Sequence, residues 1–141
     1  MRSSRRAWLA AAVLAAIGVA GAGFAAWRAF APRPRVFIGS TFARALDGDV
    51  TLRAGQPIRV LLSSPRRFGD GGFVELELHQ LGDGDRVLQV IPLRATATDD
   101  EVVFAMPDVT QLVGRARGHF RVVFVRDGAR LAAADFTVPA P

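Results

Sequence analysis

Hydrophobic and polar positions follow two different patterns along the chain, and each predicts a different kind of element. Residues 7–27 carry no charged side chain, so 21 consecutive positions are apolar or small. As an α-helix this segment is about 30 Å long, which matches the hydrocarbon thickness of a bilayer. It predicts a transmembrane helix over residues 7–30, preceded by a cytoplasmic tail of residues 1–6.

Residues typical of membrane interfaces stand at both ends of this apolar segment. Trp8 and Trp27 are 19 positions apart, about 28 Å along a helix, which suits the two aromatic belts of a bilayer. Arg5 and Arg6 precede the segment and Arg28 follows it. The basic group before the segment is compact and adds the α-amino charge, which favours an N-terminus on the cytoplasmic side.

The composition indicates a GC-rich bacterial genome, because Arg, Ala, Gly and Val are plentiful while Lys, Asn and Tyr are absent. Together with the orientation, it predicts a single-pass protein of the bacterial inner membrane whose C-terminal domain lies in the periplasm. The chain has no cysteine, which excludes disulfides and thiolate metal sites.

Cleavage of the apolar segment is the alternative to its retention as an anchor. Residues 20–22 (Ala-Gly-Ala) and 29–31 (Ala-Phe-Ala) both resemble signal-peptidase sites. Cleavage at the second site would leave Pro32 at the new N-terminus, which is a poor context. The apolar run also exceeds the usual signal core of about 7–15 residues. We therefore expect retention of the anchor.

The residues that begin the segment resemble a known export signal. Ser4-Arg5-Arg6-Ala7-Trp8-Leu9 is similar to the twin-arginine motif, with Trp8 where Phe is common. This resemblance implies that the domain crosses the membrane already folded. The alternative is the ordinary basic start of a membrane helix.

Small residues recur at every fourth position of the apolar segment. Gly18, Ala22 and Ala26 would lie on one face of the helix, where they allow close approach of a second membrane helix. This predicts docking against an integral membrane partner subunit, while codon bias is the alternative explanation.

The rest of the chain consists of short β-rich runs divided by Gly, Pro and Asp. After a Pro/Arg linker (31–35), strands are expected at 36–38, 50–52, 58–63, 73–79, 86–93, 101–106, 118–125 and 131–138. Val74, Leu76 and Leu78 alternate with polar residues, which is typical of a strand with one buried face. The frequent turns favour an all-β, two-sheet sandwich over 36–138, followed by a tail of residues 139–141.

The last two expected strands resemble the end of an immunoglobulin-like or fibronectin-type sandwich. Gly-His-Phe-Arg-Val at 118–122 is followed by the Asp127-Gly128 turn. Phe120 stands where that family often has a corner tyrosine, and Val122 where immunoglobulins have a cysteine. The resemblance implies a bacterial immunoglobulin-like antiparallel sandwich without the disulfide or the corner hydroxyl bond. It says little about function.

The basic excess belongs to the flanks of the apolar segment. The net charge is +5, yet six of the 18 basic residues lie in the first 35 positions and all 13 acidic residues follow Leu46. From residue 36 onward, 12 arginines stand against 13 acids, a net charge of −1. This distribution argues against a nucleic-acid-binding face.

The sequence shows no motif for catalysis or for cofactor binding. A metal site would need both histidines, His79 and His119, together with carboxylates such as Glu75 or Glu77. The acidic turns do not have the spacing of a calcium loop. Nucleophile-elbow, phosphate-loop and HExxH motifs are absent. We therefore predict no enzyme activity, no cofactor and no metal.

Two basic groups are candidates for contact with an acidic partner or with lipid head groups. They are Arg115, Arg117 and Arg121 near one end of the expected sandwich, and Arg66, Arg67 and Phe68, with Phe68 as an apolar contact. The alternative for both groups is an ordinary solvated surface.

These observations favour a non-catalytic accessory or structural subunit of a bacterial inner-membrane complex, of respiratory, photosynthetic or envelope type. The helix would anchor it in the lipid bilayer and dock against membrane subunits, while sandwich loops would bind a periplasmic protein. The alternative is a secreted periplasmic binding module released by cleavage. A third hypothesis is an enzyme whose site is assembled in space.

Overall fold

The computed structural model describes residues 31–40 and 50–141, and residues 33–141 form one compact unit. The predicted anchor over 7–30 lies outside the described residues. So do the side chains expected at its interfaces and packing face: Trp8, Trp27, Arg5, Arg6, Arg28, Gly18, Ala22 and Ala26. Within the described part of the chain, no helix has the length and apolar character needed to cross a bilayer.

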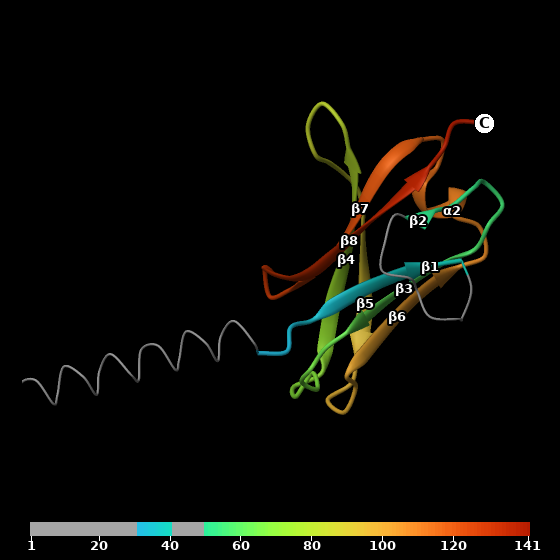
Figure 1. Ribbon diagram of the computed structural model, residues 1–141. Coiled ribbons are helices and arrows are strands. Elements are labelled where there is room, and N and C mark those ends of the chain that lie inside the picture. The colour runs from blue at the N-terminus through green and yellow to red at the C-terminus, as the bar shows by residue number, and fades with distance from the viewer. Residues whose placement is uncertain (1–30, 41–49) are drawn as a thin grey trace, which may run out of the picture. The chain divides into compact units, whose positions relative to one another are not determined.

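Two β-sheets form the domain (Figure 1). The smaller has the strand order β1-β3-β6, and the larger has the order β2-β8-β7-β4-β5. All pairs are antiparallel except β2 with β8, which is parallel. The strands are β1 (Arg35–Gly39), β2 (Val50–Thr51), β3 (Ile58–Ser63), β4 (Gly72–Leu81), β5 (Arg86–Ala95), β6 (Glu101–Met106), β7 (Gly118–Arg126) and β8 (Ala129–Val138). The predicted all-β class and two-sheet architecture are confirmed.

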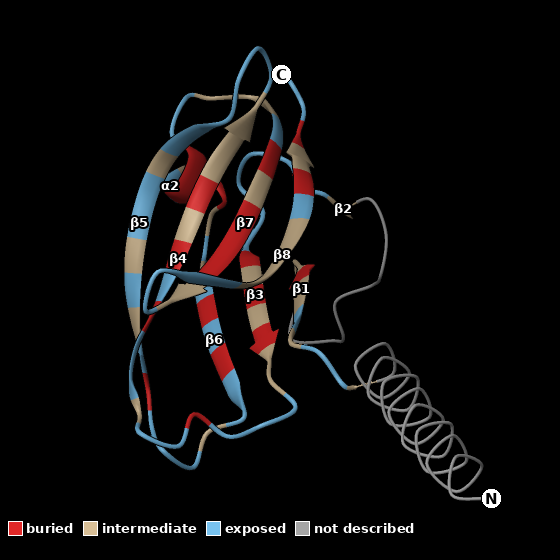
Figure 2. Ribbon diagram, turned by 90° about the vertical axis from the view of Figure 1, so that its left-hand side faces the viewer, coloured by how far each residue is buried: buried red, intermediate tan, exposed pale blue. Residues whose placement is uncertain are grey.

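The strands form where the sequence alternates, because successive side chains of a strand point to opposite faces. Val74, Leu76 and Leu78 of β4 are buried, as expected. Figure 2 shows buried positions alternating with more exposed ones along β3, β4 and β6. β3 and β6 have the predicted bounds, and the other strand ends agree with the prediction within two residues.

The hydrophobic core lies between the two sheets and receives side chains from both. Its largest members come from β7 and β8: Phe120, Phe124 and Phe136 are almost fully buried. The rings of Phe120 and Phe136 stack with their centroids 5.3 Å apart. Paired aromatic rings at this distance contribute beyond their buried area.

The turn between β7 and β8 has the two-residue form that its sequence predicts. Asp127 has φ +51° and Gly128 has φ +76°. Two consecutive residues with positive φ define the type I′ turn, whose twist matches that of the flanking strands. The predicted hairpin is therefore confirmed.

One helical turn interrupts the strands and was not expected from the sequence. α2 (Thr110–Val113) follows β6 and buries Leu112 and Val113 against the core. Pro107 ends β6 as predicted, because proline cannot donate a hydrogen bond to the sheet.

Candidate functional site

The outer face of the five-stranded sheet is polar at its centre, and its charged groups have partners within the chain. Arg121 of β7 makes two hydrogen bonds to Asp135 of β8, from Nε to Oδ1 at 2.7 Å and from Nη2 to Oδ2 at 2.8 Å. The hydrogen bond from Arg121 lowers the pKa of Asp135, and the same contact raises the pKa of Arg121. Arg121, a predicted partner-contact residue, is thus engaged inside the domain.

Both histidines lie on this same face and also have neighbours in the chain. His79 Nε2 is 2.9 Å from Glu77 Oε2, and His119 Nδ1 is 3.0 Å from Thr137 Oγ1. Val123 is buried among the polar side chains of this face, although it does not belong to the core between the sheets. The described residues contain no group of three or more potential metal ligands.

The β5 edge of this face is more apolar than its centre. Val87 and Val90 of β5 are about half exposed, and Phe73 at the start of β4 is 63% exposed. Pro92 lies further along β5, opposite Glu75 of β4. We call Val87, Val90 and Pro92 the β5 strip. It is a narrow row along one edge strand.

One row on the outer face of the three-stranded sheet is apolar across all three strands, between a row with Arg59 and a row with Arg35, Ser63 and Glu101. Phe37 of β1, Leu61 of β3 and Val103 of β6 are aligned by the strand register. Their neighbours Ile38, Val60 and others fill the core, so this row points the opposite way. Val103 is 44% exposed, and Phe37 and Leu61 are partly exposed. We call these three residues the outer row.

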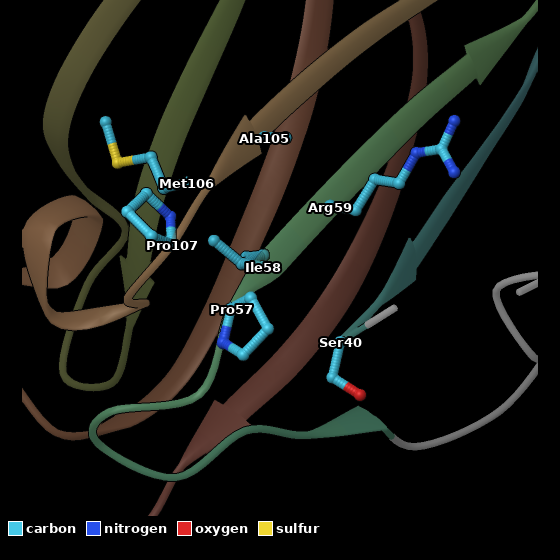
Figure 3. A pocket seen from close by; sticks show the side chains of 7 residues that line it. All are labelled: Ser40, Pro57, Ile58, Arg59, Ala105, Met106 and Pro107. Atoms are coloured by element: carbon cyan, nitrogen blue, oxygen red, sulfur yellow. The ribbon is translucent and has the colours of Figure 1, made fainter. Parts of the chain in front are cut away.

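A hollow of about 450 Å³ adjoins the outer row at the ends of β3 and β6. Its lining is mostly apolar: Ser40, Pro57, Ile58, Arg59, Ala105, Met106 and Pro107. Figure 3 shows Pro57, Ile58 and Pro107 grouped together, while the Arg59 side chain extends away from them. The hollow can accept an apolar side chain or a small apolar molecule.

A carboxylate holds the segments that form this hollow. Asp108 Oδ1 accepts hydrogen bonds from the backbone N–H of Thr110, at 2.8 Å, and of Gly55, at 3.0 Å. The bond from Thr110 is the main reason that the pKa of Asp108 lies below its usual value. The turn before Pro57 and the helix after Pro107 are thereby joined by one side chain.

The basic loop at 64–71 differs in one residue from its prediction. Phe68 is only 4% exposed and belongs to the core. The Arg126 guanidinium lies over its ring, 5.4 Å from the centroid, and donates to the Gly71 carbonyl at 2.7 Å. The expectation that Phe68 offers an apolar contact to a partner is therefore corrected. Arg66 and Arg67 are exposed, as that hypothesis requires.

The second basic group lies at the opposite end of the sandwich, beside the start of β7. Arg115 is exposed, whereas Arg117 Nη1 donates to the carbonyl oxygens of Gly114, at 3.0 Å, and Ala116, at 2.8 Å. With Arg121 paired to Asp135, the structure does not join the three predicted arginines into one open patch. The two basic groups are also far apart, because they stand at opposite ends of β4 and β7.

The comparisons with known proteins add no relationship. No protein-family model matches the chain, and no curated protein matches it. The candidate site is therefore defined by its geometry alone, and the outer row with its hollow is the surface that this geometry favours.

Sequence reasoning missed the outer row, although the sequence contains a signal for it. Val36-Phe37-Ile38 and Val102-Val103-Phe104 are continuous apolar runs inside strands. Because side chains alternate, a strand that is apolar at every position must direct some apolar residues away from its own core. The register that aligns the two runs could not be read from the sequence.

Proposed function

We propose that this protein is a non-catalytic interaction subunit of a bacterial inner-membrane complex. One N-terminal helix anchors it, and its periplasmic sandwich binds a partner protein. The observation that carries the proposal is the outer row, an apolar stripe across all three strands of the smaller sheet that leads to the hollow. Apolar patches with a concave anchor point are typical of protein interfaces.

The strand order supports an immunoglobulin-like assignment of the sandwich. The order β1-β3-β6 corresponds to strands A-B-E of that fold, and β8-β7-β4-β5 corresponds to G-F-C-C′. In this assignment Phe120 takes the place of the corner tyrosine and stacks on Phe136. Folds of this class serve many functions, so the assignment supports the architecture and leaves the function to the surface.

The outer row suits a partner because its three side chains lie side by side on a rigid sheet. Covering an exposed aliphatic side chain contributes about 1.5–3 kcal/mol when burial is complete. A charge at the same position would have to be desolvated without a partner, which opposes association. A single substitution in the row therefore distinguishes an interface from an ordinary surface.

The experiment compares two exposed valines on different sheets. Val103 of the outer row and Val90 of the β5 strip are 44% and 51% exposed, so a glutamate at either position can reach solvent. The tagged full chain is purified from native membranes in mild detergent and sized. We expect the wild type and Val90→Glu to retain the same companion, and Val103→Glu to lose it by tenfold or more.

Three results would contradict this proposal. If the wild-type chain is a monomer without a companion in mild detergent, it is not a subunit of a stable complex. Loss of the companion only in Val90→Glu would move the interface to the β5 strip. Full extraction of the chain by an alkaline carbonate wash would remove the anchor.

The hollow favours a second candidate function, a periplasmic binding module for a small apolar ligand. Its volume of about 450 Å³ lies within the range of small-molecule pockets. This function requires release of the domain by cleavage after residue 22 or 31. N-terminal sequencing of the mature protein tests it, because an intact N-terminus favours the anchored subunit.

A further inference from the structure

We propose that the linker-proximal end of the sandwich contacts the phosphate groups of the bilayer that holds the anchor. The contact is made by Arg66 and Arg67, and Phe73 at the same end of the sandwich adds an apolar aromatic side chain. This inference rests on the proposed membrane anchor, and it names a second partner of the same domain, the phospholipid surface.

The topology defines which end of the sandwich is proximal. β1 begins at Arg35, directly after the linker, and Arg35 is paired with Ser63 at the end of β3. The loop at 64–71, the start of β4 and the β7–β8 turn belong to this same end (Figure 1). We call it the proximal end, and the end with α2 the distal end.

The length of the linker places only the proximal end within reach of lipid. Residues 31–34 span at most about 14 Å, since an extended chain covers about 3.6 Å per residue. The ten residues of β4 extend about 33 Å from the proximal to the distal end. Loops at the proximal end therefore meet the head groups at high effective concentration, while distal loops stay well away from them.

The loop that carries the two arginines is held by the core and by its neighbours. Phe68 is buried, and its N–H donates to the Asp99 carbonyl at 2.9 Å. The Ser64 N–H donates to the Asp100 carbonyl at 2.7 Å. Arg126 adds the bond to Gly71 described above. The loop thus has a fixed backbone, so binding through its side chains costs little further backbone entropy.

The side chains of Arg66 and Arg67 are available for an anionic ligand. Both are exposed, and among the described residues neither guanidinium makes an ion pair or a hydrogen bond. A guanidinium binds phosphate oxygens through two parallel hydrogen bonds. Phe73, 63% exposed at the same end, is an apolar aromatic side chain suited to the boundary between head groups and acyl chains.

The proximal end also carries carboxylates, which offset the positive charge of its arginines. Asp99 accepts a hydrogen bond from the Thr96 N–H at 2.7 Å, and Asp127 lies 3.9 Å from Arg126. Asp70, Asp100 and Glu101 are exposed. Because acids balance most of the arginines here, we do not expect a general electrostatic attraction. We expect phosphate binding by two named side chains.

The test uses the full chain in nanodiscs of phosphatidylethanolamine and phosphatidylglycerol, with no other protein present. The chain has no cysteine, so one fluorophore can be placed by Ala97→Cys at the proximal end or by Ala54→Cys at the distal end. Energy transfer to a head-group-labelled lipid then reports the distance of each end from the surface. We expect strong transfer from position 97 and weak transfer from position 54.

The charge variant and its control remove the same number of arginines from opposite ends. The quantity compared is the ratio of chains whose proximal end lies on the lipid surface to chains whose proximal end is free. Arg66→Gln with Arg67→Gln should reduce this ratio about 30-fold, since each arginine near a membrane contributes about fivefold. Arg86→Gln with Arg115→Gln removes two exposed distal arginines and should leave the ratio unchanged. Phe73→Ser should also reduce transfer from position 97.

The outcomes separate this inference from the proposed function. A chain that withstands carbonate extraction but gives the same transfer in the Arg66/Arg67 variant and its control overturns the phosphate contact alone. A chain that carbonate extracts overturns the anchor and this inference with it. Stronger transfer from position 54 than from position 97 would reverse the orientation and also overturn it.

Discussion

Side chains of the same type in this domain should differ sharply in how much their removal lowers the free energy of unfolding. The chain has ten phenylalanines and no tyrosine, so its aromatic residues bring no hydroxyl that would need a partner. Phe120 is fully buried and stacked on Phe136, while Phe73 is largely exposed. The sequence predicted the inward direction of Phe120 from alternation. It could not predict the burial of Phe68, because that depends on long-range packing: Phe68 belongs to the core, and Arg126, 58 positions away in the chain, lies over its ring.

Phe120→Ala should lower the free energy of unfolding by about 3–5 kcal/mol, because it removes a buried ring and leaves a cavity. Phe73→Ala, the matched control, should change it by less than about 0.5 kcal/mol. Urea unfolding in detergent measures both. Circular dichroism is the suitable signal, because Trp8 and Trp27 are the only tryptophans and both lie in the predicted anchor. Equal losses in the two variants would contradict the assigned core.

Elements whose limits depend on local chemistry were predicted well, and the element that depends on a distant contact was not. β3 begins after Pro57 and β6 ends before Pro107, so both bounds are visible in the sequence. α2 has only four residues, and its N-terminal cap, Val109, offers no side-chain hydrogen bond. Asp108 supports this turn by accepting from the Thr110 N–H, and the same oxygen joins the turn to Gly55, 53 positions earlier. Such a contact has no signature in local sequence.

The Asp108 contact predicts a pH dependence of stability. Its pKa is lower in the folded chain than the usual 3.8, so the folded state favours the carboxylate. The stabilisation is complete above pH 3.8 and is lost as the pH falls from there through the folded pKa. Asp108→Asn should therefore be less stable than wild type at neutral pH, and the difference should shrink in acid.

Urea midpoints between pH 7 and pH 2.5 provide the measurement for Asp108→Asn. Asp83→Asn, at an exposed turn residue, is the control and should follow the wild-type curve. A difference between Asp108→Asn and wild type that stays constant down to the lowest pH would show that the charge of Asp108 plays no part.

At the scale of the whole molecule, the features that suggest function are assembled from separate parts of the sequence. The outer row joins β1, β3 and β6, which are more than 60 residues apart at their extremes. The two-sheet class followed from strand number and turn frequency. The adjacency of those strands depends on long-range pairing, so the candidate site could not be located before the fold was known.

The predicted helix and the sandwich should act together in assembly. Replacing Gly18 and Ala22 by leucine would separate the anchor from a partner helix, because small residues at this spacing permit close backbone contact. The double substitution should reduce the recovery of the companion subunit in mild detergent, while Ala16→Leu with Ala20→Leu serves as a control on the opposite face of the predicted helix. Unchanged recovery in both variants would assign assembly to the sandwich alone.

Pro92 in the β5 strip has a consequence for how densely copies of the chain could be packed if it is membrane-anchored as proposed. β5 is the outermost described strand of its sheet and offers ten residues of open backbone. Tethered chains are concentrated in two dimensions, where open edges readily template fibrils. Proline lacks the N–H needed for the ladder and interrupts it midway. If the proposed anchor holds the chain in a membrane, this interruption should keep neighbouring copies from pairing edge to edge and so lower their tendency to aggregate.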